Sequence, residues 1–343
     1  MVIFLRILLI FFLTGSDLIF SLDARLSTLR SSILANSTKQ TYSSYLRSYI
    51  SFCNKLYIPL VPISPLNLCR FVAFLSFRLS FHSIRNYLSV VKLLHIETGH
   101  PNPLESHYLN NILKGAKRLL GTQTSPKLPI TPSLLQKIFT TLNFKQPLDM
   151  VFWAACLVAF FSFFPKSNLL APSWQLFDPA KHLSRSNVSF QDSGAVISVR
   201  WSKTIQFSER ALQIPIPHIP NSPFCPSCIL RLIFVLFPTP QLQSPAFSYR
   251  ANNRWHILTY NTFLFKLKKS LTLVGIDSSN YSGHSFRRGG ASFALECGLP
   301  PDLIQSQGDW KSDAYRTYLD PSLACRLQVA NRLGQEIHRL FPC

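Results

Sequence analysis

Acidic residues are scarce in this chain of 343 residues, which carries 15 aspartates and glutamates against 35 lysines and arginines. The formal net charge is therefore +20, and the excess begins early, with 12 basic and 2 acidic residues between Ala24 and Thr122. Such an imbalance indicates a polyanionic partner, either nucleic acid or an anionic membrane surface. A basic surface that only keeps the protein soluble is the plainer alternative.

The chain also lacks the usual elements of a metal or cofactor site. It has no glycine-rich phosphate loop, and Cys225 and Cys228 form its single C-x-x-C pair, so no second pair completes a zinc set. Glu97, between His95 and His100, has no metal-ligand spacing with any partner. We therefore expect no metal, no organic cofactor and no small-molecule substrate. The scattered cysteines fit a reducing compartment, and the C-x-x-C stretch is expected to form a turn before a helix, with a redox-active pair as the alternative.

A long apolar run is missing from the N-terminus as well. Residues 7–13 are strongly apolar and follow Arg6, so residues 1–23 resemble a secretory signal, but the run is too short to span a membrane. Three interpretations stay open: a true signal, a buried or disordered extension, or a wrongly chosen start in translated genomic sequence. Because the chain behind it is basic and its cysteines are scattered, we favour the last two together and expect no membrane attachment.

Residues 24–120 are predicted to form a compact helical bundle with a basic surface. Apolar residues recur there at helical spacing, and Pro62, Pro65 and Gly121 mark breaks or ends. The predicted helices are Ser37–Cys53, Leu66–Ser80, Phe81–Thr98 and Pro103–Leu120. Residues 121–132 are rich in proline and small polar residues and are predicted to be an interdomain linker.

Residues 133–343 are predicted to form a second, mostly α domain with a small antiparallel β-sheet. Val151–Phe164 is almost wholly apolar and too short for a membrane span, which favours a buried core helix. Ala195–Trp201 and Ala211–Ile216 are predicted strands of a hairpin that carries Lys203. The remaining predicted helices are Ser133–Leu142, Cys228–Phe237, Asn261–Val274 and Ser285–Glu296. The predicted fold class is therefore mainly α.

The most informative group of residues lies near the end of the chain. His284 and Arg287 fall on one helical turn, and Trp310 and Tyr318 follow. Phosphoryl transfer to a tyrosine needs a nucleophile, donors that stabilise charge on the phosphate oxygens, and a proton for the leaving oxygen. The planar fork of an arginine matches phosphate geometry, and Lys203 on a hairpin could deliver the proton. The group suits chemistry on a phosphodiester; the alternative for the helical pair is a solvated face.

Two longer motifs carry a family resemblance. Gly283–Ala291 (GHSFRRGGA) and Gly308–Tyr318 (GDWKSDAYRTY) resemble the tyrosine recombinase, or phage-integrase, family. The closest likeness is to eukaryotic members from DIRS- and Ngaro-like retrotransposons and Crypton-type elements. Arg200–Thr204 (RWSKT) resembles the catalytic-lysine hairpin of the family, and Phe164–Leu170 (FPKSNLL) resembles its first arginine box. The helical bundle, residues 24–120, resembles the core-binding (SAM-like) domain, which implies that it clamps DNA.

The resemblance implies a role for five residues. Tyr318 would be the nucleophile, forming a 3′-phosphotyrosyl link with DNA, and Arg287 would clamp the scissile phosphate. His284 would assist proton transfer and hold the phosphate. Lys203 would be the general acid, and Trp310 would donate its indole N–H to a phosphate oxygen. This mechanism requires neither a metal nor an organic cofactor.

Two positions depart from the family pattern. Tyr318 is eight residues after Trp310, one fewer than is common in the family, and Tyr315 at five residues competes with it. We favour Tyr318 and expect Tyr315 to face the core or pack on its helix. Pro165 stands where the first catalytic arginine is expected, and proline has neither charge nor donor. Because losing one preorganised donor typically costs on the order of a hundred- to thousand-fold in rate, we expect DNA binding to survive and cleavage to be weak or absent.

The leading prediction is a nuclear tyrosine recombinase that acts on double-stranded DNA in recombination and integration and, by resemblance, assembles as a homo-tetramer. The first alternative is a non-catalytic DNA-binding remnant of a mobile element, and the second is a secreted or membrane-surface basic protein. An amphipathic stripe in the tail could dock on a neighbouring subunit or pack within its own chain. Its residues are Arg326, Leu327, Val329, Leu333 and Ile337.

Overall fold

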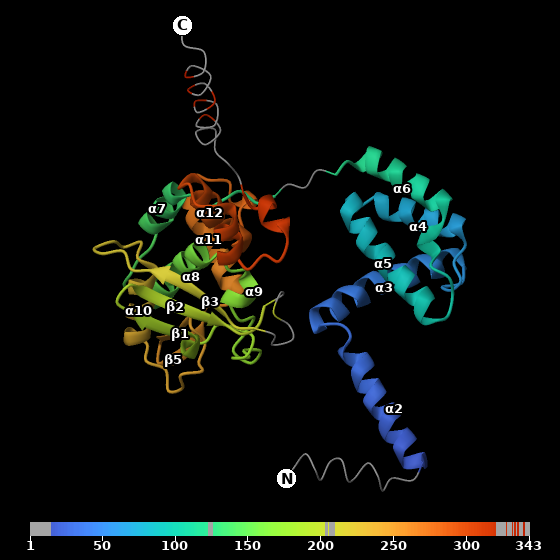
Figure 1. The fold of residues 1–343 in the computed structure, drawn as a ribbon, viewed down its shortest axis with the longest axis horizontal. Coiled ribbons are helices and arrows are strands. Elements are labelled where there is room, and N and C mark those ends of the chain that lie inside the picture. Colours follow the sequence, from blue (N-terminus) through green and yellow to red (C-terminus); the bar gives the residue numbers. More distant parts are fainter. Residues whose placement is uncertain are drawn as a thin grey trace. The chain divides into compact units, whose positions relative to one another are not determined.

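The computed structural model describes residues 15–122, 126–202, 205 and 210–319, together with the single positions Leu327, Asn331, Leu333, Gln335 and Arg339. The chain divides into two compact units, Met1–Thr124 and Ser125–Cys343 (Figure 1). Lys203 lies outside the described residues, as do residues 1–14 and three members of the predicted tail stripe. No helix within the described ranges is long and apolar enough to cross a membrane.

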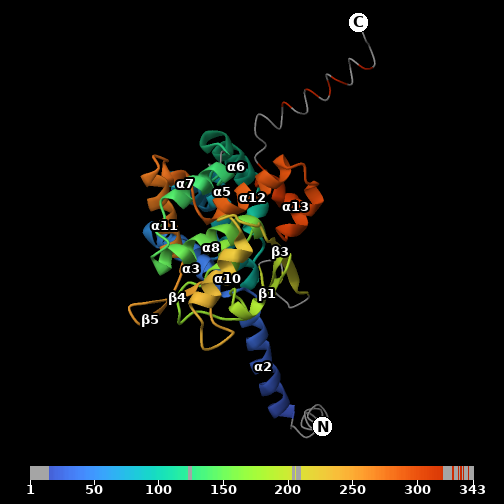
Figure 2. The same cartoon turned by 90° about the vertical axis from the view of Figure 1, so that its left-hand side faces the viewer.

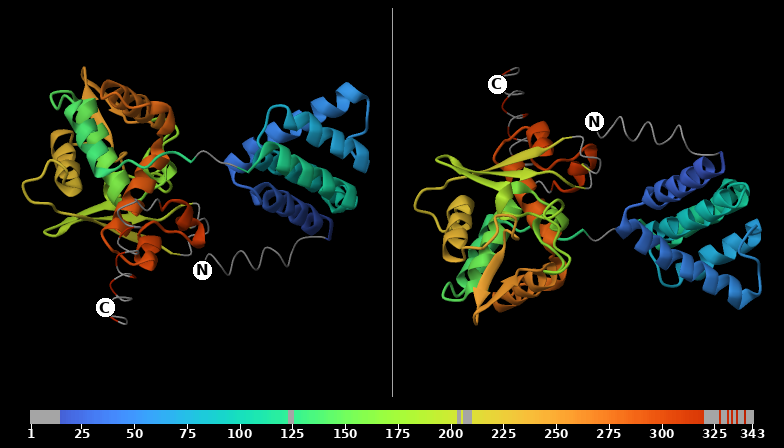
Figure 3. Two further views of the ribbon diagram at one scale, coloured as in Figure 1. Left: turned by 90° about the horizontal axis from the view of Figure 1, so that it is seen from above. Right: turned by 90° about the horizontal axis from the view of Figure 1, so that it is seen from below.

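The first unit is α-helical and is coloured blue to teal in Figure 3; its helices between Asn36 and Leu120 form a bundle, whereas the helix before them is largely exposed. Its elements are α2 (Gly15–Ser32), α3 (Asn36–Leu56), α4 (Pro65–Ser76), α5 (Phe81–Glu97), the 3₁₀ turn η1 (Pro103–Glu105) and α6 (His107–Leu120). The last helix begins later than expected, because η1 forms a separate turn and the Ser106 hydroxyl accepts a hydrogen bond from Leu109 N–H at the start of α6.

Aromatic side chains fill the space between these helices. Tyr49 and Phe52 of α3 contact Phe71 of α4, with ring centroids 5.3 Å and 5.0 Å apart, and all three are buried. The buried ring of His95 accepts a hydrogen bond from Ile63 N–H at 3.0 Å, and its other nitrogen lies 2.8 Å from a main-chain carbonyl of its own helix. Both ring nitrogens therefore have partners, and this histidine has a structural role in the bundle.

The second unit combines helices with two small antiparallel sheets (Figure 2). Its helices are α7 (Pro132–Thr140), α8 (Pro147–Ser162), α9 (Lys166–Leu169), α10 (Pro226–Leu236), α11 (Tyr260–Leu273), α12 (Gly283–Glu296) and α13 (Pro301–Gln307). Its strands are β1 (Val188–Gln191), β2 (Gly194–Val199), β3 (Leu212–Pro217), β4 (Ser248–Ala251) and β5 (Arg254–Ile257), and its 3₁₀ turns are η2 (Arg185–Asn187), η3 (Ser278–Asn280) and η4 (Asp313–Thr317). The predicted fold class, mainly α with a small antiparallel sheet, is confirmed.

The apolar helix α8 lies at the centre of the second unit. All its residues from Val151 to Phe160 are buried, and it contacts α10, α12, β3 and β4 (Figure 1). The predicted buried core helix is therefore confirmed, and its uniform apolarity follows from the lack of a solvent-facing side. Trp153 donates its indole N–H to the Pro223 carbonyl at 2.9 Å, so the polar atom of this fully buried ring is satisfied.

The three-stranded sheet places the hairpin that was predicted from the sequence. Strands β1, β2 and β3 lie in sequence order, and each neighbouring pair is antiparallel. The register of β2 and β3 pairs Gly194 with Pro217 at one end and Val199 with Leu212 at the other. The segment that contains Lys203 therefore leaves the sheet at the second of these ends. Strand β1 and the β4–β5 pair were not predicted.

The segment between the predicted domains belongs partly to the second unit. Leu128 N–H donates to the Asn280 carbonyl and Ile130 N–H to the Ser285 carbonyl, each at 2.9 Å, and Ile130 is fully buried. The second half of the predicted linker, 121–132, therefore packs against α12 and the turn before it. Residues 123–125 lie outside the described part of the chain.

Candidate active site

Two glycines allow α12 to pack directly on main chain. A Cβ atom on Gly289 would lie 1.9 Å from the carbonyl oxygen of Ile130, and one on Gly290 would lie 2.1 Å from that of Phe160 in α8. No other residue fits at these distances without a shift of the backbone. This close approach fixes how near α12 lies to α8, and it therefore also fixes the position of the motif residues that α12 carries.

Arg287 of α12 is buried and bound on several sides. Its guanidinium donates hydrogen bonds to the main-chain carbonyls of Phe163 and Gly308, the latter at 2.8 Å. Its Cζ lies 3.8 Å from the ring centroid of Trp310 and 5.3 Å from that of Tyr318. Burial lowers the pKa of Arg287 to about 10, against an opposing effect of Tyr318. The group therefore keeps its charge near neutral pH, in an orientation fixed before any ligand arrives.

Trp310 is held beneath this guanidinium by the turn after α13. Its main-chain N–H donates to the Gln305 carbonyl at 3.1 Å, and the Gln305 side-chain amide donates to the Trp310 carbonyl at 3.0 Å. A Cβ atom on Gly308 would meet the indole ring at 1.7 Å. The glycine therefore lets the ring fold back over the turn, where it forms a flat surface under Arg287.

The two candidate tyrosines occupy different environments. Tyr315, within η4, is 5% exposed and belongs to a buried cluster with Trp310 and Ile304. Tyr318, at the end of η4, is half-buried and lines a cavity, with its ring centroid 5.3 Å from that of Trp310. Tyr315 does not line that cavity.

The cavity has a volume of about 500 Å³ and collects residues from distant parts of the second unit. Four of the five predicted site residues line it: His284, Arg287, Trp310 and Tyr318. Pro165, between α8 and α9, lines the same cavity. The fifth predicted residue, Lys203, lies outside the described residues, but its neighbour Ser202 is part of the cavity wall.

The segment that carries the predicted general acid is anchored on both flanks. On one side, the Asn168 amide donates to the Trp201 carbonyl at 2.7 Å. On the same side, Ser202 donates to the Asp309 carboxylate at 3.2 Å, and on the other side Arg210 forms an ion pair with the same carboxylate. The hairpin end is therefore tied both to the first motif box and to the turn that positions the tryptophan.

Sequence reasoning missed these anchoring residues. Asp309 stands between two motif residues and Asn168 lies inside the first box, so their positions were visible in the motifs. Their partners were not, because the hydrogen bond from Ser202 to Asp309 joins residues 107 positions apart. A carboxylate next to the motif tryptophan was the one available signal.

Comparison with known proteins gives a consistent picture, although no protein-family model matches the chain. In sequence, the chain is similar to a curated integrase/recombinase xerD homolog from Selenomonas ruminantium, at 22% identity over 286 residues, covering 81% of this chain and 80% of the relative.

Several solved structures share its fold. The Tn1549 transposon integrase in complex with transposon right end DNA has a TM-score of 0.61 at 13% identity, covering 90% of this chain and 98% of that one. The XerH recombinase bound to difH after cleavage has a TM-score of 0.56 at 14% identity, covering 81% and 75%. A lambda integrase dimer bound to a core site has a TM-score of 0.56 at 17% identity, covering 87% and 76%. The chain thus shares the fold of these integrases and recombinases.

Proposed function

We propose that this chain binds double-stranded DNA as a protein of the tyrosine recombinase type, and that Pro165 impairs its strand cleavage and rejoining. The observation that carries the proposal is the convergence of four motif residues and Pro165 on one cavity. Solved proteins of the same fold were captured with DNA, including the transposon integrase on transposon end DNA and lambda integrase on a core site. These likenesses support a DNA partner in recombination or integration.

The proposed reaction transfers a phosphoryl group from DNA to Tyr318 and back. The Tyr318 phenol gives up its proton to His284 as its oxygen attacks the scissile phosphorus, the bond to the 5′-oxygen breaks, and that oxygen takes a proton from Lys203. Arg287 has five N–H donors, so it can serve its two carbonyl partners and a phosphate oxygen together. His284 would hold the phosphate and assist proton transfer, and Trp310 would add its indole donor.

Pro165 leaves this arrangement one cationic donor short. Among the described residues that line the cavity, Arg287 is the single arginine. Pro165, in the segment that resembles the first arginine box, offers neither a charge nor a hydrogen bond to a phosphate oxygen. A DNA-binding remnant of a mobile element, with little or no cleavage, is therefore the second candidate, and Pro165 is the observation that favours it.

The helical bundle has a basic depression of its own, which we propose as a second DNA contact. Arg85 of α5 and Lys114 and Lys117 of α6 line a surface cavity of about 510 Å³, together with His107 and Asn110. All five side chains are exposed. Lysines, arginines and polar side chains grouped in this way are suited to contacts with a phosphate backbone.

Duplex binding should depend steeply on salt concentration, and the basic depression should contribute to the slope. The logarithm of the binding constant is expected to fall linearly with the logarithm of salt concentration, by about 0.9 per neutralised phosphate. The double variant Lys114→Ala/Lys117→Ala should reduce that slope by roughly 1 to 2, measured by fluorescence anisotropy on a labelled duplex.

The matched control removes two exposed lysines of α11 that line neither cavity, Lys268→Ala/Lys269→Ala, and should leave the slope nearly unchanged. Binding that ignores salt, or an equal loss in both double variants, would contradict the assignment of the depression. Binding to anionic vesicles without duplex binding would instead support the membrane-surface alternative.

The finer parts of the proposal rest on the motif resemblance. They are membership of the retrotransposon or Crypton-type subgroup, action in the nucleus, and assembly as a homo-tetramer on DNA. Analytical ultracentrifugation of the protein with a duplex tests the last of these, since a tetrameric complex and a monomeric one differ strongly in sedimentation.

A further inference from the structure

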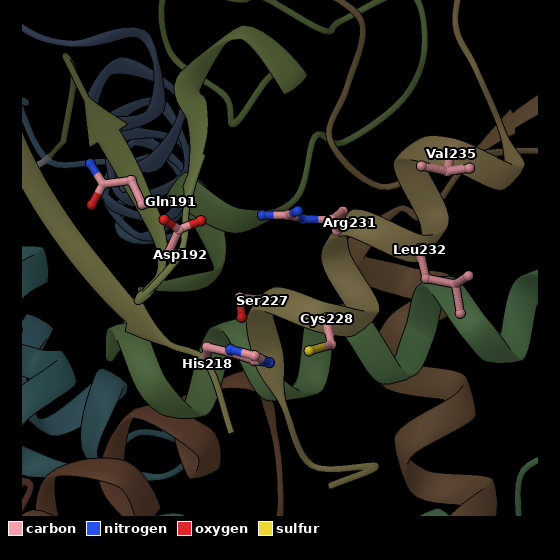
Figure 4. A pocket seen from close by; sticks show the side chains of 8 residues that line it. All are labelled: Gln191, Asp192, His218, Ser227, Cys228, Arg231, Leu232 and Val235. Atoms are coloured by element: carbon pink, nitrogen blue, oxygen red, sulfur yellow. The ribbon is translucent and has the colours of Figure 1, made fainter. Parts of the chain in front are cut away.

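A second group of reactive side chains lies in the second unit, outside the cavity of Tyr318. His218 follows β3, and Cys225 and Cys228 stand at the start of α10. One possible ligand atom from each lies within 4.8 Å of the other two. Figure 4 shows His218 and Cys228 turned toward one another beside a surface pocket of about 490 Å³. Among the residues that the structure describes, none lines both this pocket and the Tyr318 cavity.

The sequence predicts no metal site because a second C-x-x-C pair is missing, but the fold brings a histidine to the first pair, and we propose that His218, Cys225 and Cys228 bind a zinc ion. Two thiolates and an imidazole form a soft donor set that selects zinc over magnesium or calcium. With metal–ligand bonds of about 2.0 to 2.3 Å, donor atoms at tetrahedral positions lie roughly 3.5 Å apart, so small side-chain movements complete the site. The pocket gives solvent access to the group, so a water molecule can take the fourth position.

The surroundings of Cys225 are those of a metal-bound sulfur. Its Sγ accepts hydrogen bonds from Ile219 N–H at 3.2 Å and from Cys228 N–H at 3.3 Å, and lies 3.4 Å from the Ser227 hydroxyl. Main-chain donors aimed at a ligating sulfur stabilise its negative charge and orient it. Cys225 also caps α10, a helix of 11 residues, whose N-terminal N–H groups favour a thiolate.

The proposed ion would link α10 to the end of the sheet whose strands β2 and β3 flank Lys203. His218 N–H donates to the Ser193 carbonyl at 3.0 Å, which fixes the histidine to the turn between β1 and β2. A zinc ion would connect this turn and the end of β3 to the first turn of α10. Because β3 pairs with β2 over its whole length, the link would stabilise the sheet from the end opposite Lys203.

A redox pair is the chemical competitor, because a C-x-x-C at a helix start also suits a disulfide. The Sγ atoms of Cys225 and Cys228 lie 2.8 Å apart, and both cysteines are free. The participation of His218 separates the two assignments. A disulfide between the two cysteines does not require the imidazole of His218, whereas the affinity of the site for zinc falls when any of the three ligands is lost.

Zinc retention by the full-length, reduced protein tests the proposal. After incubation with zinc and desalting, elemental analysis should find one zinc per chain, and zinc should raise the thermal midpoint. His218→Ala and Cys228→Ser, both at exposed positions, should each weaken zinc binding at least tenfold in competition with a chelator. Cobalt should give a thiolate charge-transfer band that Cys228→Ser weakens.

The matched control is Cys297→Ser, which removes an exposed free thiol elsewhere and should leave zinc binding intact. Circular dichroism confirms that each variant is folded. The proposal is overturned if the reduced protein retains no zinc, or if His218→Ala binds it as tightly as the unchanged protein. It is also overturned if alkylation finds Cys225 and Cys228 oxidised to a disulfide after purification under reducing conditions.

Discussion

Replacing Pro165 with arginine should raise the yield of covalent protein–DNA complex by on the order of a hundred- to thousand-fold. Pro165 lines the same cavity as Arg287 and Tyr318, so an arginine side chain at this position would extend from the wall of that cavity. Its planar fork could contact the phosphate together with Arg287, and the developing charge would then be shared between two preorganised donors.

The local backbone can accept this change. The Pro165 carbonyl receives a hydrogen bond from Asn168 N–H at 3.0 Å, and an arginine carbonyl would accept it equally. Arginine also adds an N–H at a helix start, where main-chain donors need no partner within the helix. We therefore expect Pro165→Arg to fold as the unchanged protein does.

The measurement is trapping on a nicked suicide substrate, in which the cleaved strand diffuses away and the covalent complex accumulates. Pro240→Arg is the matched control, since it also exchanges a proline for an arginine, but at an exposed position outside the cavity. It should trap no more DNA than the unchanged protein. Equal trapping by the unchanged protein and Pro165→Arg would contradict the role assigned to Pro165.

Arg287→Lys, introduced into the Pro165→Arg protein, should lower the rate of covalent complex formation by on the order of a hundredfold or more. A lysine cannot bond both the Phe163 and Gly308 carbonyls and present a fork to phosphate. The burial that lowers the pKa of Arg287 to about 10 would also lower that of a lysine, which begins from a lower ordinary value. Single-turnover cleavage of the suicide substrate gives the rate.

Duplex affinity and the thermal midpoint separate loss of chemistry from loss of fold in this variant. We expect both to change far less than the rate. Arg250→Lys, at an exposed position on β4, is the matched control and should leave the rate unchanged. A rate for Arg287→Lys within a few fold of its parent would remove Arg287 from the phosphate-binding group.

The predictable parts of the fold are those that a single segment encodes. The uniform apolarity of α8 predicted its burial, and helical spacing predicted α5 and α11 nearly to their ends. The β4–β5 pair was missed because each strand has four residues and its turn signal is Asn252–Asn253. Both asparagines adopt positive φ, 49° and 57°, as a tight hairpin turn requires.

In the candidate site, too, the sequence predicted the residues that local motifs contain but not the contacts between distant segments. Motif spacing singled out His284, Arg287, Trp310 and Tyr318, because all four lie within one stretch of the chain. Contacts between distant segments were beyond that reasoning. The pairing of Asp309 with the hairpin, and the approach of His218 to the C-x-x-C pair, depend on how the strands and helices pack.

The most direct test of the account is to find which residue becomes joined to DNA. Pro165→Arg protein trapped on the suicide substrate can be digested and the DNA-linked peptide identified by mass spectrometry. We expect a phosphodiester link to Tyr318, lost in Tyr318→Phe and kept in Tyr315→Phe, because Tyr318 lines the cavity while Tyr315 is buried. A link at Tyr315, an adduct that survives Tyr318→Phe, or no adduct in any form would contradict it.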